Sequence, residues 1–565
     1  MITGLLVLAF VCGLGALAAL VLVGHGFSPK GGGWFTPDVV GGVFTLHPLL
    51  VAVPSAACFV CGLVDWRRPW RVEHLDLLAL AGFFPVAMLL SDDISGAGLW
   101  LAAICLGWLL CRMLGVAFGM WRMPELRPSI SSRRLGLAIA MLLLVRIGSI
   151  AGGNILDVGQ ASSLGAWRLL HGLHLYGAVW WQGPGGFRIY RPDSYGPFAY
   201  YAYIPFAAVF PLPPEMVATL LPALCFDALT LAGLYRLGRR LGGRLGGRPL
   251  AQAFVFAYLL YPFPDLSLMS ETNDALIAAL CVWTIVVAAE RPVARGLLTA
   301  AAALTKFLPA LLALQFLGIK RGRRRYALTL TVSLAAMLAW PLITSGPAQF
   351  LDSTFGYQLI QRGGGIQFSI WTYMPHAAGV ARPVLAAALV LLALAPMART
   401  GVQNAREQAA LAAALLIGGQ LLLGYWFYSY LTWFYPLVVI VIIRSRPEVA
   451  GQLGTHESEP AGGSGQRDVQ VRPPARGCPL DPGRVDDDHR VELESLGLLR
   501  GEDRNRGVEI RPGGEAELRG GRGDAGGRRD HGHAPGADQL CLAPHQVGEV
   551  PGADVPRVLG AVTHG

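Results

Sequence analysis

Apolar segments long enough to cross a bilayer recur along residues 1–445 of this chain. Apolar residues make up 53% of the sequence and charged residues only 15%, and the mean hydropathy is +0.47. This composition is typical of polytopic membrane proteins. The candidate spans are 2–24, 45–65, 75–91, 96–121, 135–151, 214–236, 251–268, 273–289, 296–318, 326–344, 383–398, 408–424 and 431–444. The sequence therefore predicts an all-α polytopic membrane protein with about 12–13 transmembrane helices.

Arginine-rich loops indicate how these helices are oriented. Basic clusters occur at Arg67–Arg71, Arg122–Arg134, Arg236–Arg248 and Lys320–Arg325. The positive-inside rule places these loops in the cytoplasm. Alternation of the spans then puts the loop 152–213 outside. We expect a multi-pass protein of the cytoplasmic membrane that acts on its outer side.

The segment 296–318 conflicts with this topology if it crosses the membrane once. A single crossing would put the cluster Lys320–Arg325 outside, and it would place Lys306 near the bilayer centre. A bare ammonium group there costs at least ~2.5–3.5 kcal/mol. Two short arms joined at an outer turn remove both problems. We therefore expect the chain to break near Lys306 and Pro309.

The loop 152–213 is polar and lies between long apolar segments. Asp157 directly follows an apolar segment, and an amphipathic pattern at 160–172 predicts a short helix. The segment 198–212, rich in aromatic residues and proline, predicts a helix at the membrane interface, not a full span. A large outer loop with juxtamembrane helices and an acid near the lipid boundary suits an enzyme that acts on a lipid-borne substrate.

The C-terminal region has a different composition. From Gly451 onward the chain contains no Lys, Phe, Tyr, Trp or Met and is dense in Gly, Arg, Asp and Pro. Such a segment cannot bury a core, so we expect residues 446–565 to be a disordered cytoplasmic tail. Two origins stay open: a genuine tail, or an out-of-frame extension of a GC-rich gene. The expected division is 1–134 (N-terminal helices), 135–445 (catalytic membrane core) and 446–565 (tail).

Short motifs follow one another along residues 135–445: Asp157-Val158-Gly159, Gly172-Leu173-His174-Leu175-Tyr176, Asp193-Ser194-Tyr195-Gly196-Pro197, Cys225-Phe226-Asp227-Ala228-Leu229-Thr230, Tyr261-Pro262-Phe263, Thr272-Asn273-Asp274, Thr305-Lys306-Phe307 and Phe368-Ser369-Ile370-Trp371. Their order resembles the GT-C superfamily of glycosyltransferases, and in particular the family-87-like integral membrane proteins of actinobacteria. The resemblance implies a GT-C-like fold. It also implies transfer of mannose or another hexose or pentose from a polyprenyl-phosphate donor to a lipid or cell-envelope glycan acceptor.

Asp157 is the catalytic residue that this resemblance implies. Substitution at an anomeric carbon requires removal of a proton from the acceptor hydroxyl, and a carboxylate within hydrogen-bond reach can accept it. The alternative is structural, because Asp157 could instead be an exposed helix-end acid or the N-cap of the following helix.

The leaving phosphate needs positive charge more than it needs a proton. Lys306 at an outer turn and Arg362 in the loop 345–382 are the expected donor-phosphate ligands. A snorkelling lysine and a solvated loop arginine are the alternatives. Arg362-Gly363-Gly364-Gly365 also departs from the pattern expected of relatives, in which a polar residue and a proline lead into Phe-Ser-Ile-Trp.

Five further residues are expected to bind substrate: Tyr176, Asp193, Tyr195, Asn273 and Asp274. The aromatic rings suit stacking against sugars, although aromatic residues also line membrane interfaces. Asn273 and Asp274 could equally be ordinary residues of a helix first turn. Asp227 lies within an apolar segment, where we expect it to be paired with an arginine or a hydroxyl group.

No cofactor is required by the sequence, and no metal-spaced His/Cys cluster occurs in it. A divalent metal stays open because Asp157 and Asp193 share a loop. The expected partners are a polyprenyl-phosphate-linked sugar, a lipid or glycan acceptor and membrane lipids, and no nucleic acid. The alternative function is a polytopic lipid or glycan transporter or flippase without transferase activity, although no internal repeat supports it.

Overall fold

The computed structural model describes residues 48–444, with gaps at 66–67, 69, 85–94, 129–130, 151–155, 179, 183–187, 211–215, 358–368, 373, 399–403 and 425–427. The first candidate span, 2–24, and the expected tail, 446–565, lie outside these residues. The division of the chain at residue 134 remains a prediction.

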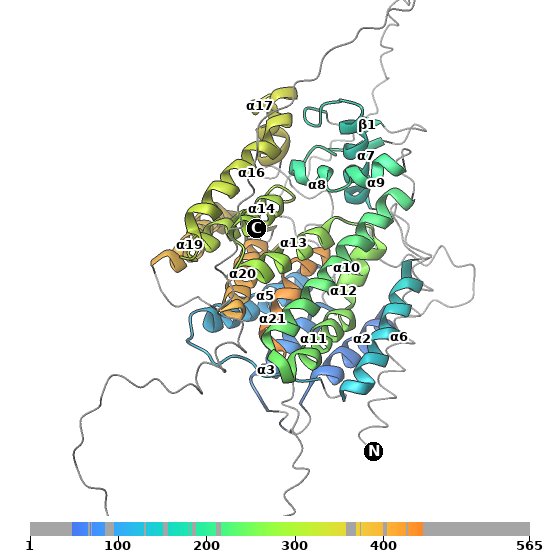
Figure 1. Cartoon of the computed structure of the whole chain (residues 1–565), viewed down its shortest axis with the longest axis vertical. Coiled ribbons are helices and arrows are strands. Elements are labelled where there is room, and N and C mark those ends of the chain that lie inside the picture. Colours follow the sequence, from blue (N-terminus) through green and yellow to red (C-terminus); the bar gives the residue numbers. More distant parts are fainter. Residues whose placement is uncertain are drawn as a thin grey trace, which may run out of the picture. The chain divides into compact units, whose positions relative to one another are not determined.

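The described elements are almost all helical (Figure 1). In chain order they are α2 (Pro48–Leu63), α3 (Glu73–Ala81), α5 (Ser95–Ala117), α6 (Ser132–Ile150), α7 (Asp157–Leu170), β1 (Trp180–Gln182), β2 (Arg188–Tyr190), α8 (Pro197–Tyr201), α9 (Ile204–Val209), α10 (Met216–Leu241), α11 (Gly243–Leu260), α12 (Pro262–Met269), α13 (Asp274–Val287), α14 (Pro292–Ala303), α15 (Ala310–Leu317), α16 (Arg323–Thr344), α17 (Pro347–Leu351), the π-helix η4 (Asp352–Gly356), the 3-10 helix η5 (Ile370–Thr372), α19 (Pro375–Ala398), α20 (Ala405–Leu422), the 3-10 helix η6 (Tyr428–Tyr430) and α21 (Leu431–Ile442).

Four helices in the described part of the chain are long and apolar enough to span a membrane. They cover Ala97–Ala117, Ala218–Leu241, Arg323–Thr344 and His376–Ala398. Proline divides one of the other predicted spans, 251–268, between two helices. Pro262 begins α12 directly after α11 ends at Leu260. The predicted all-α membrane fold is confirmed.

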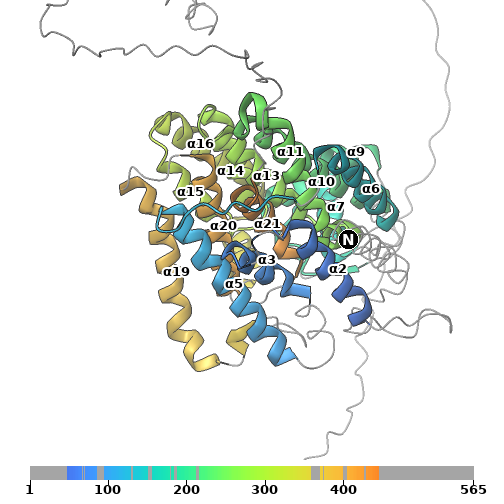
Figure 2. The same cartoon turned by 90° about the horizontal axis from the view of Figure 1, so that it is seen from below.

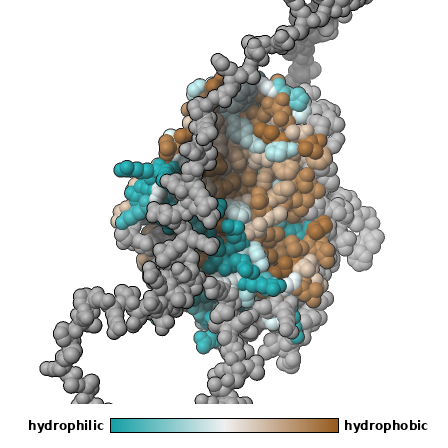
Figure 3. Space-filling view, viewed as in Figure 1, coloured by the Kyte–Doolittle hydropathy of each residue, from teal (hydrophilic) through white to brown (hydrophobic). Residues whose placement is uncertain are grey.

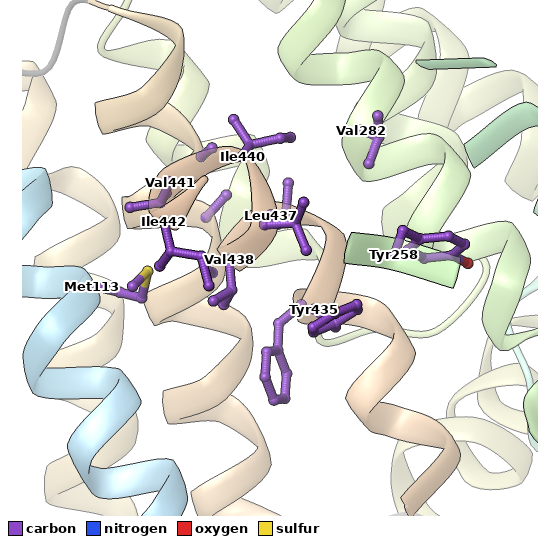
Figure 4. Packing of buried hydrophobic residues seen from close by; sticks show 14 of the residues in the cluster. Met113, Tyr258, Val282, Tyr435, Leu437, Val438, Ile440, Val441 and Ile442 are labelled. Carbon is purple, nitrogen blue, oxygen red and sulfur yellow. The ribbon is translucent and has the colours of Figure 1, made fainter. Parts of the chain in front are cut away.

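The centre of the fold is formed by α20 and α21, whose residues are almost all buried. α20 packs against α5 and α21, and α13 packs against α10 and α21. Seen from below, α5 and α19 lie outside this pair of central helices (Figure 2). Figure 4 shows Ile442 and Val438 of α21 on the side of Met113 of α5, and Leu437 on the side of Tyr258 of α11.

The outward faces of α16 and α19 are apolar. Exposed residues there include Leu328 and Val332 on α16 and Val384 and Leu391 on α19. The face in Figure 3 is broadly hydrophobic, with hydrophilic residues gathered in patches. A surface of this kind is what contact with lipid chains requires.

The expected hairpin around Lys306 is present. α14 ends at Ala303, α15 begins at Ala310, and Lys306 lies in the turn between them. The far ends of the two arms meet again, because Gly322 lies against Pro292 and the Arg295 guanidinium contacts the carbonyl of Arg321 at 3.5 Å. The segment 296–318 is therefore two short arms, as its lysine and proline predicted.

The described residues between 156 and 210 form a layer of short elements at one end of the helices (Figure 1). α7 packs against α8 and α9. β1 and β2 pair antiparallel in a small hairpin, with Trp181 opposite Ile189, and the sequence had not predicted these strands. The described part of the predicted interfacial segment 198–212 contains the two short helices α8 and α9.

Asp227 is paired inside the helical bundle, as expected. Its carboxylate lies 3.3 Å from the Arg146 guanidinium, and the Tyr258 hydroxyl donates to it at 2.9 Å. Arg146 also donates to Asp265 at 3.2 Å. These contacts tie α6, α10 and α12 together, because a buried charge must be matched by opposite charge and hydrogen bonds.

Candidate functional site

The turn that carries Lys306 is bound by the Tyr195-Gly196-Pro197 segment. The backbone N–H of Gly196 donates to the carbonyl of Thr305 at 3.2 Å, and that of Phe198 donates to Leu304 at 2.9 Å. A Cβ at Gly196 would overlap the carbonyl of Leu304, so only glycine permits this approach. The result is that the Tyr195 ring lies 5.9 Å from the Lys306 ammonium group.

Lys306 forms a buried ion pair with Asp274. Its Nζ lies 2.5 Å from Asp274 Oδ1, and the two side chains are 10% and 1% exposed. Asp274 is the first residue of α13, and its backbone N–H is held by the Thr272 hydroxyl at 3.4 Å. The hairpin turn and the start of α13 are thereby fixed to each other.

Two aromatic residues of the last described segment also contact Lys306. Its ammonium group lies 4.8 Å from the ring centre of Tyr430 and 4.9 Å from that of Trp433. These two rings are stacked, with their centres 4.3 Å apart. Cation–π contacts of this kind stabilise a lysine that has been removed from water.

Asp157 begins α7 and lies near Lys306. Its carboxylate accepts the backbone N–H of Val158 at 2.9 Å, and its side chain is exposed to solvent. The protein atoms crowded around the carboxyl group exclude part of its hydration and raise its pKa, and the positive charge of Lys306 partly offsets that effect. An accessible carboxylate of raised pKa next to a cation can exchange protons with a bound hydroxyl group.

α7 is joined to the start of α13 by several contacts. The backbone N–H of Leu156 donates to Ser270 at 3.1 Å, and the Asn273 amide donates to the Ser162 hydroxyl at 3.1 Å. Asn273 Oδ1 and Asp274 Oδ2 are buried and have no hydrogen-bond partner within the described residues. Two unpaired acceptors thus lie side by side in the sequence at the end of α13 that faces α7.

Tyr176 and Asp193 each form a hydrogen bond with a backbone group of the loop 152–213, which contains Tyr195. Both are buried; the Tyr176 hydroxyl donates to the carbonyl of Tyr195 at 3.0 Å, and Asp193 accepts the backbone N–H of Gly177 at 3.1 Å. Burial raises the pKa of Asp193, and a hydrogen bond from Ser353 opposes that change. In this arrangement Tyr176 supports the Tyr195 backbone and Asp193 binds the backbone of Gly177, and their predicted contact with substrate remains a prediction.

The structure therefore brings together Asp157, Lys306, Tyr195, Asn273 and Asp274. Arg362 lies outside the described residues, so its predicted phosphate contact remains a prediction. Close to it in sequence, Ser369 donates to Leu423 at 2.8 Å and the Trp371 indole donates to Leu421 at 2.8 Å. These bonds attach the end of that loop to the end of α20.

Sequence reasoning missed Ser429, Tyr430 and Trp433. The only signal was an aromatic-rich stretch at the start of the last apolar segment, which membrane interfaces also produce. Sequence reasoning also gave no role to Glu271. This residue is buried, has a positive φ of 50° and accepts a hydrogen bond from the Thr219 hydroxyl. Burial raises the pKa of Glu271 to about 7.

Among the described residues, no three acidic, histidine or cysteine side chains lie close enough together to hold a metal ion. Asp157 and Asp193, which share a loop, have separate surroundings in the structure: the first lies by Lys306 and the second by Gly177.

A comparison with known protein families matches part of the chain. Residues 194–424 match the model of glycosyltransferase family 87, a range that contains Tyr195, Asn273, Asp274 and Lys306. Asp157 and Trp433 lie on either side of it. No curated protein matches the chain. Together, this match and the apolar helices indicate a multi-pass membrane glycosyltransferase that is similar to family 87 over residues 194–424.

Proposed function

We propose that this enzyme transfers a sugar, mannose or another hexose or pentose, from a polyprenyl-phosphate donor to a lipid or cell-envelope glycan acceptor. The reaction takes place on the outer face of the cytoplasmic membrane. The observation that carries the proposal is the proximity of an exposed carboxylate, Asp157, to a buried ammonium group, Lys306. The Asp157 carboxylate can accept the proton of the incoming hydroxyl group, and the Lys306 ammonium group can neutralise the leaving phosphate.

Asp157 acts as the general base. The acceptor hydroxyl gives its proton to the carboxylate while its oxygen bonds to the anomeric carbon of the donor sugar. The bond between that carbon and the phosphate oxygen breaks, and its electron pair leaves with the polyprenyl phosphate. The raised pKa of Asp157 favours this role, because a base works best when its pKa approaches the operating pH.

Lys306 neutralises the donor phosphate, with Arg362 as a second cation. The leaving group is already a competent anion, so electrostatic stabilisation assists its departure more than protonation would. The two unpaired acceptors, Asn273 Oδ1 and Asp274 Oδ2, are suited to bind sugar hydroxyl groups. The half-buried ring of Tyr195 offers a surface on which a sugar can stack.

The depth of Lys306 supports a donor that is held in lipid. The 12 residues of α14 rise about 18 Å from Pro292 to the hairpin turn, whereas the 22 residues of α16 rise about 33 Å. Both helices begin next to the basic residues 320–325, and the Tyr201 hydroxyl reaches Met337 of α16 at 2.9 Å. By these lengths the turn lies about 15 Å short of the far end of α16, so the donor phosphate has to reach inward from that end.

The experiment that tests the proposal uses membranes that contain the protein and radiolabelled polyprenyl-phosphate sugars, with mannose first and then other hexoses and pentoses. The expected result is label transferred to an extractable lipid or glycan in membranes with the protein and not in membranes without it. Translocation of intact donor with no new glycosidic bond would favour the transporter alternative. Transfer from a nucleotide sugar alone, with no polyprenyl-phosphate donor accepted, would contradict the proposed donor class.

A further inference from the structure

The Asp274 carboxylate has a second fixed donor besides Lys306. The indole N–H of Trp433 donates to the same Oδ1 atom at 2.7 Å. Trp433 is 2% exposed and lies in the first turn of α21, a helix whose residues are all buried. The Ser429 hydroxyl, one turn earlier, also donates to Asp274.

These contacts fix the direction of the carboxylate. A planar indole held in a packed core has little freedom, so its N–H defines where Asp274 Oδ1 lies. Lys306 has four rotatable bonds and would otherwise sample many positions. The Asp274 carboxylate on one side and the rings of Tyr430 and Trp433 on another restrict the Lys306 side chain to one position.

The pair must also change when the donor binds. A phosphate that binds Lys306 weakens its ion pair with Asp274. The buried Asp274 carboxylate then needs other hydrogen-bond donors to remain charged. Trp433 and Ser429 provide two donors that do not depend on Lys306. The carboxylate can therefore remain in place while its lysine is shared with the substrate.

We propose that Trp433 is a positioning residue of the donor-phosphate site. Its N–H orients Asp274, and through Asp274 it holds Lys306 toward the phosphate of the donor. This inference rests on the proposed function and extends the site beyond residue 424, where the family match ends. It assigns a role to the start of α21 that packing alone does not require.

The test is the variant Trp433→Phe, which keeps an aromatic ring beside Lys306 and removes the N–H donor. The matched control is Trp283→Phe. Its indole donates at 2.9 Å to the carbonyl of Leu229, far along α13 from Asp274. KM for the polyprenyl-phosphate sugar and kcat are measured for both variants and the wild-type enzyme in the same membranes, together with Tm.

The expected result for Trp433→Phe is a KM for the donor about 10-fold or more above that of the wild type, the size of a lost hydrogen bond to a charged group. kcat should change much less, and Trp283→Phe should leave KM unchanged. An unchanged KM in Trp433→Phe, or an equal rise in Trp283→Phe, would overturn the inference.

A second variant distinguishes the loss of a hydrogen bond from a loss of folding. Ser429→Ala removes the other independent donor with almost no change in volume, and a KM increase of a few-fold with unchanged Tm is expected. A Tm loss in Trp433→Phe together with normal KM in Ser429→Ala would show a structural role only. Wild-type enzyme that transfers no polyprenyl-phosphate sugar would refute the proposed function itself, whereas normal transfer by both variants would refute only the role of Trp433.

Discussion

The carbonyl oxygen of Glu271 occupies the position that a Cβ on Gly159 would need. This contact joins α7 to the segment before α13, two residues after Asp157 and three residues before Asp274. The separation between the proposed base and the Asp274–Lys306 pair therefore depends on a close backbone approach that only glycine allows.

Gly159→Ala should lower transfer activity at least 10-fold, because the added methyl group must push α7 away from Glu271 and move Asp157 with it. Gly107→Ala in α5 is the matched control, since a Cβ there meets no atom within 4 Å. Activity is compared after normalisation to folded protein. Equal activity in the two variants would mean that this contact does not position Asp157.

Lys306→Met should destabilise the protein by about 3–5 kcal/mol, because it leaves the Asp274 carboxylate buried without its cation. The double variant Lys306→Met/Asp274→Asn should recover most of that stability and remain inactive. Thermal unfolding and transfer assays on the same preparations separate the two effects. Recovery of transfer in the double variant would show that Lys306 acts only on stability.

Glu271→Gln should change how stability depends on pH. Burial raises the pKa of Glu271 from its ordinary 4.5 to about 7, so the folded state holds this proton more tightly than the unfolded state does. Stability from this group is fully present below about pH 4.5 and is lost as the pH rises through 7. Tm measured between pH 4.5 and 8 should fall less in Glu271→Gln than in the wild type. Parallel Tm curves would contradict the assignment.

Much of the fold follows from local sequence signals. The break at Lys306 was predictable because a charged lysine is costly in the middle of a membrane span, and a proline interrupts the helix there. The pairing of Asp227 was predictable because a buried acid needs a partner. The choice of Arg146 and Tyr258 was not, since it depends on how α6 and α11 pack against α10.

The site was predicted unevenly for the same reason. Asp157, Tyr195, Asp274 and Lys306 follow motifs, and the structure brings them together. Trp433 follows no motif and reaches Asp274 from 159 residues away. Tyr176 fits a motif, yet its ring is buried against Phe350. Motifs identify residue types at a spacing, whereas contacts between distant helices determine which side chains face one another.

Cysteine labelling tests the predicted orientation. In a variant without native cysteines, Leu173→Cys, exposed just beyond α7, should react with a membrane-impermeant thiol reagent added to intact cells. Arg324→Cys, exposed at the start of α16, should react only after the cells are opened, because the neighbouring arginines retain that end in the cytoplasm. Labelling of Arg324→Cys in intact cells would reverse the proposed orientation.

Asp157→Asn should leave the protein folded. The raised pKa of Asp157 means that its ionised form is disfavoured in the folded state, so this group adds no stability at neutral pH that a neutral amide would lose. The Tm of the variant should equal or exceed that of the wild type above the pKa, and should approach it as the pH falls. A clear loss of Tm at neutral pH would indicate that the carboxylate has a structural role.

The transfer rate of Asp157→Asn with a radiolabelled polyprenyl-phosphate sugar is the most direct test of Asp157 as general base. The amide keeps the shape of the side chain and cannot accept the proton of the acceptor, so the rate should fall about 10²-fold or more at unchanged protein level. Transfer within a few-fold of the wild-type rate would contradict the assignment of Asp157 as the catalytic base.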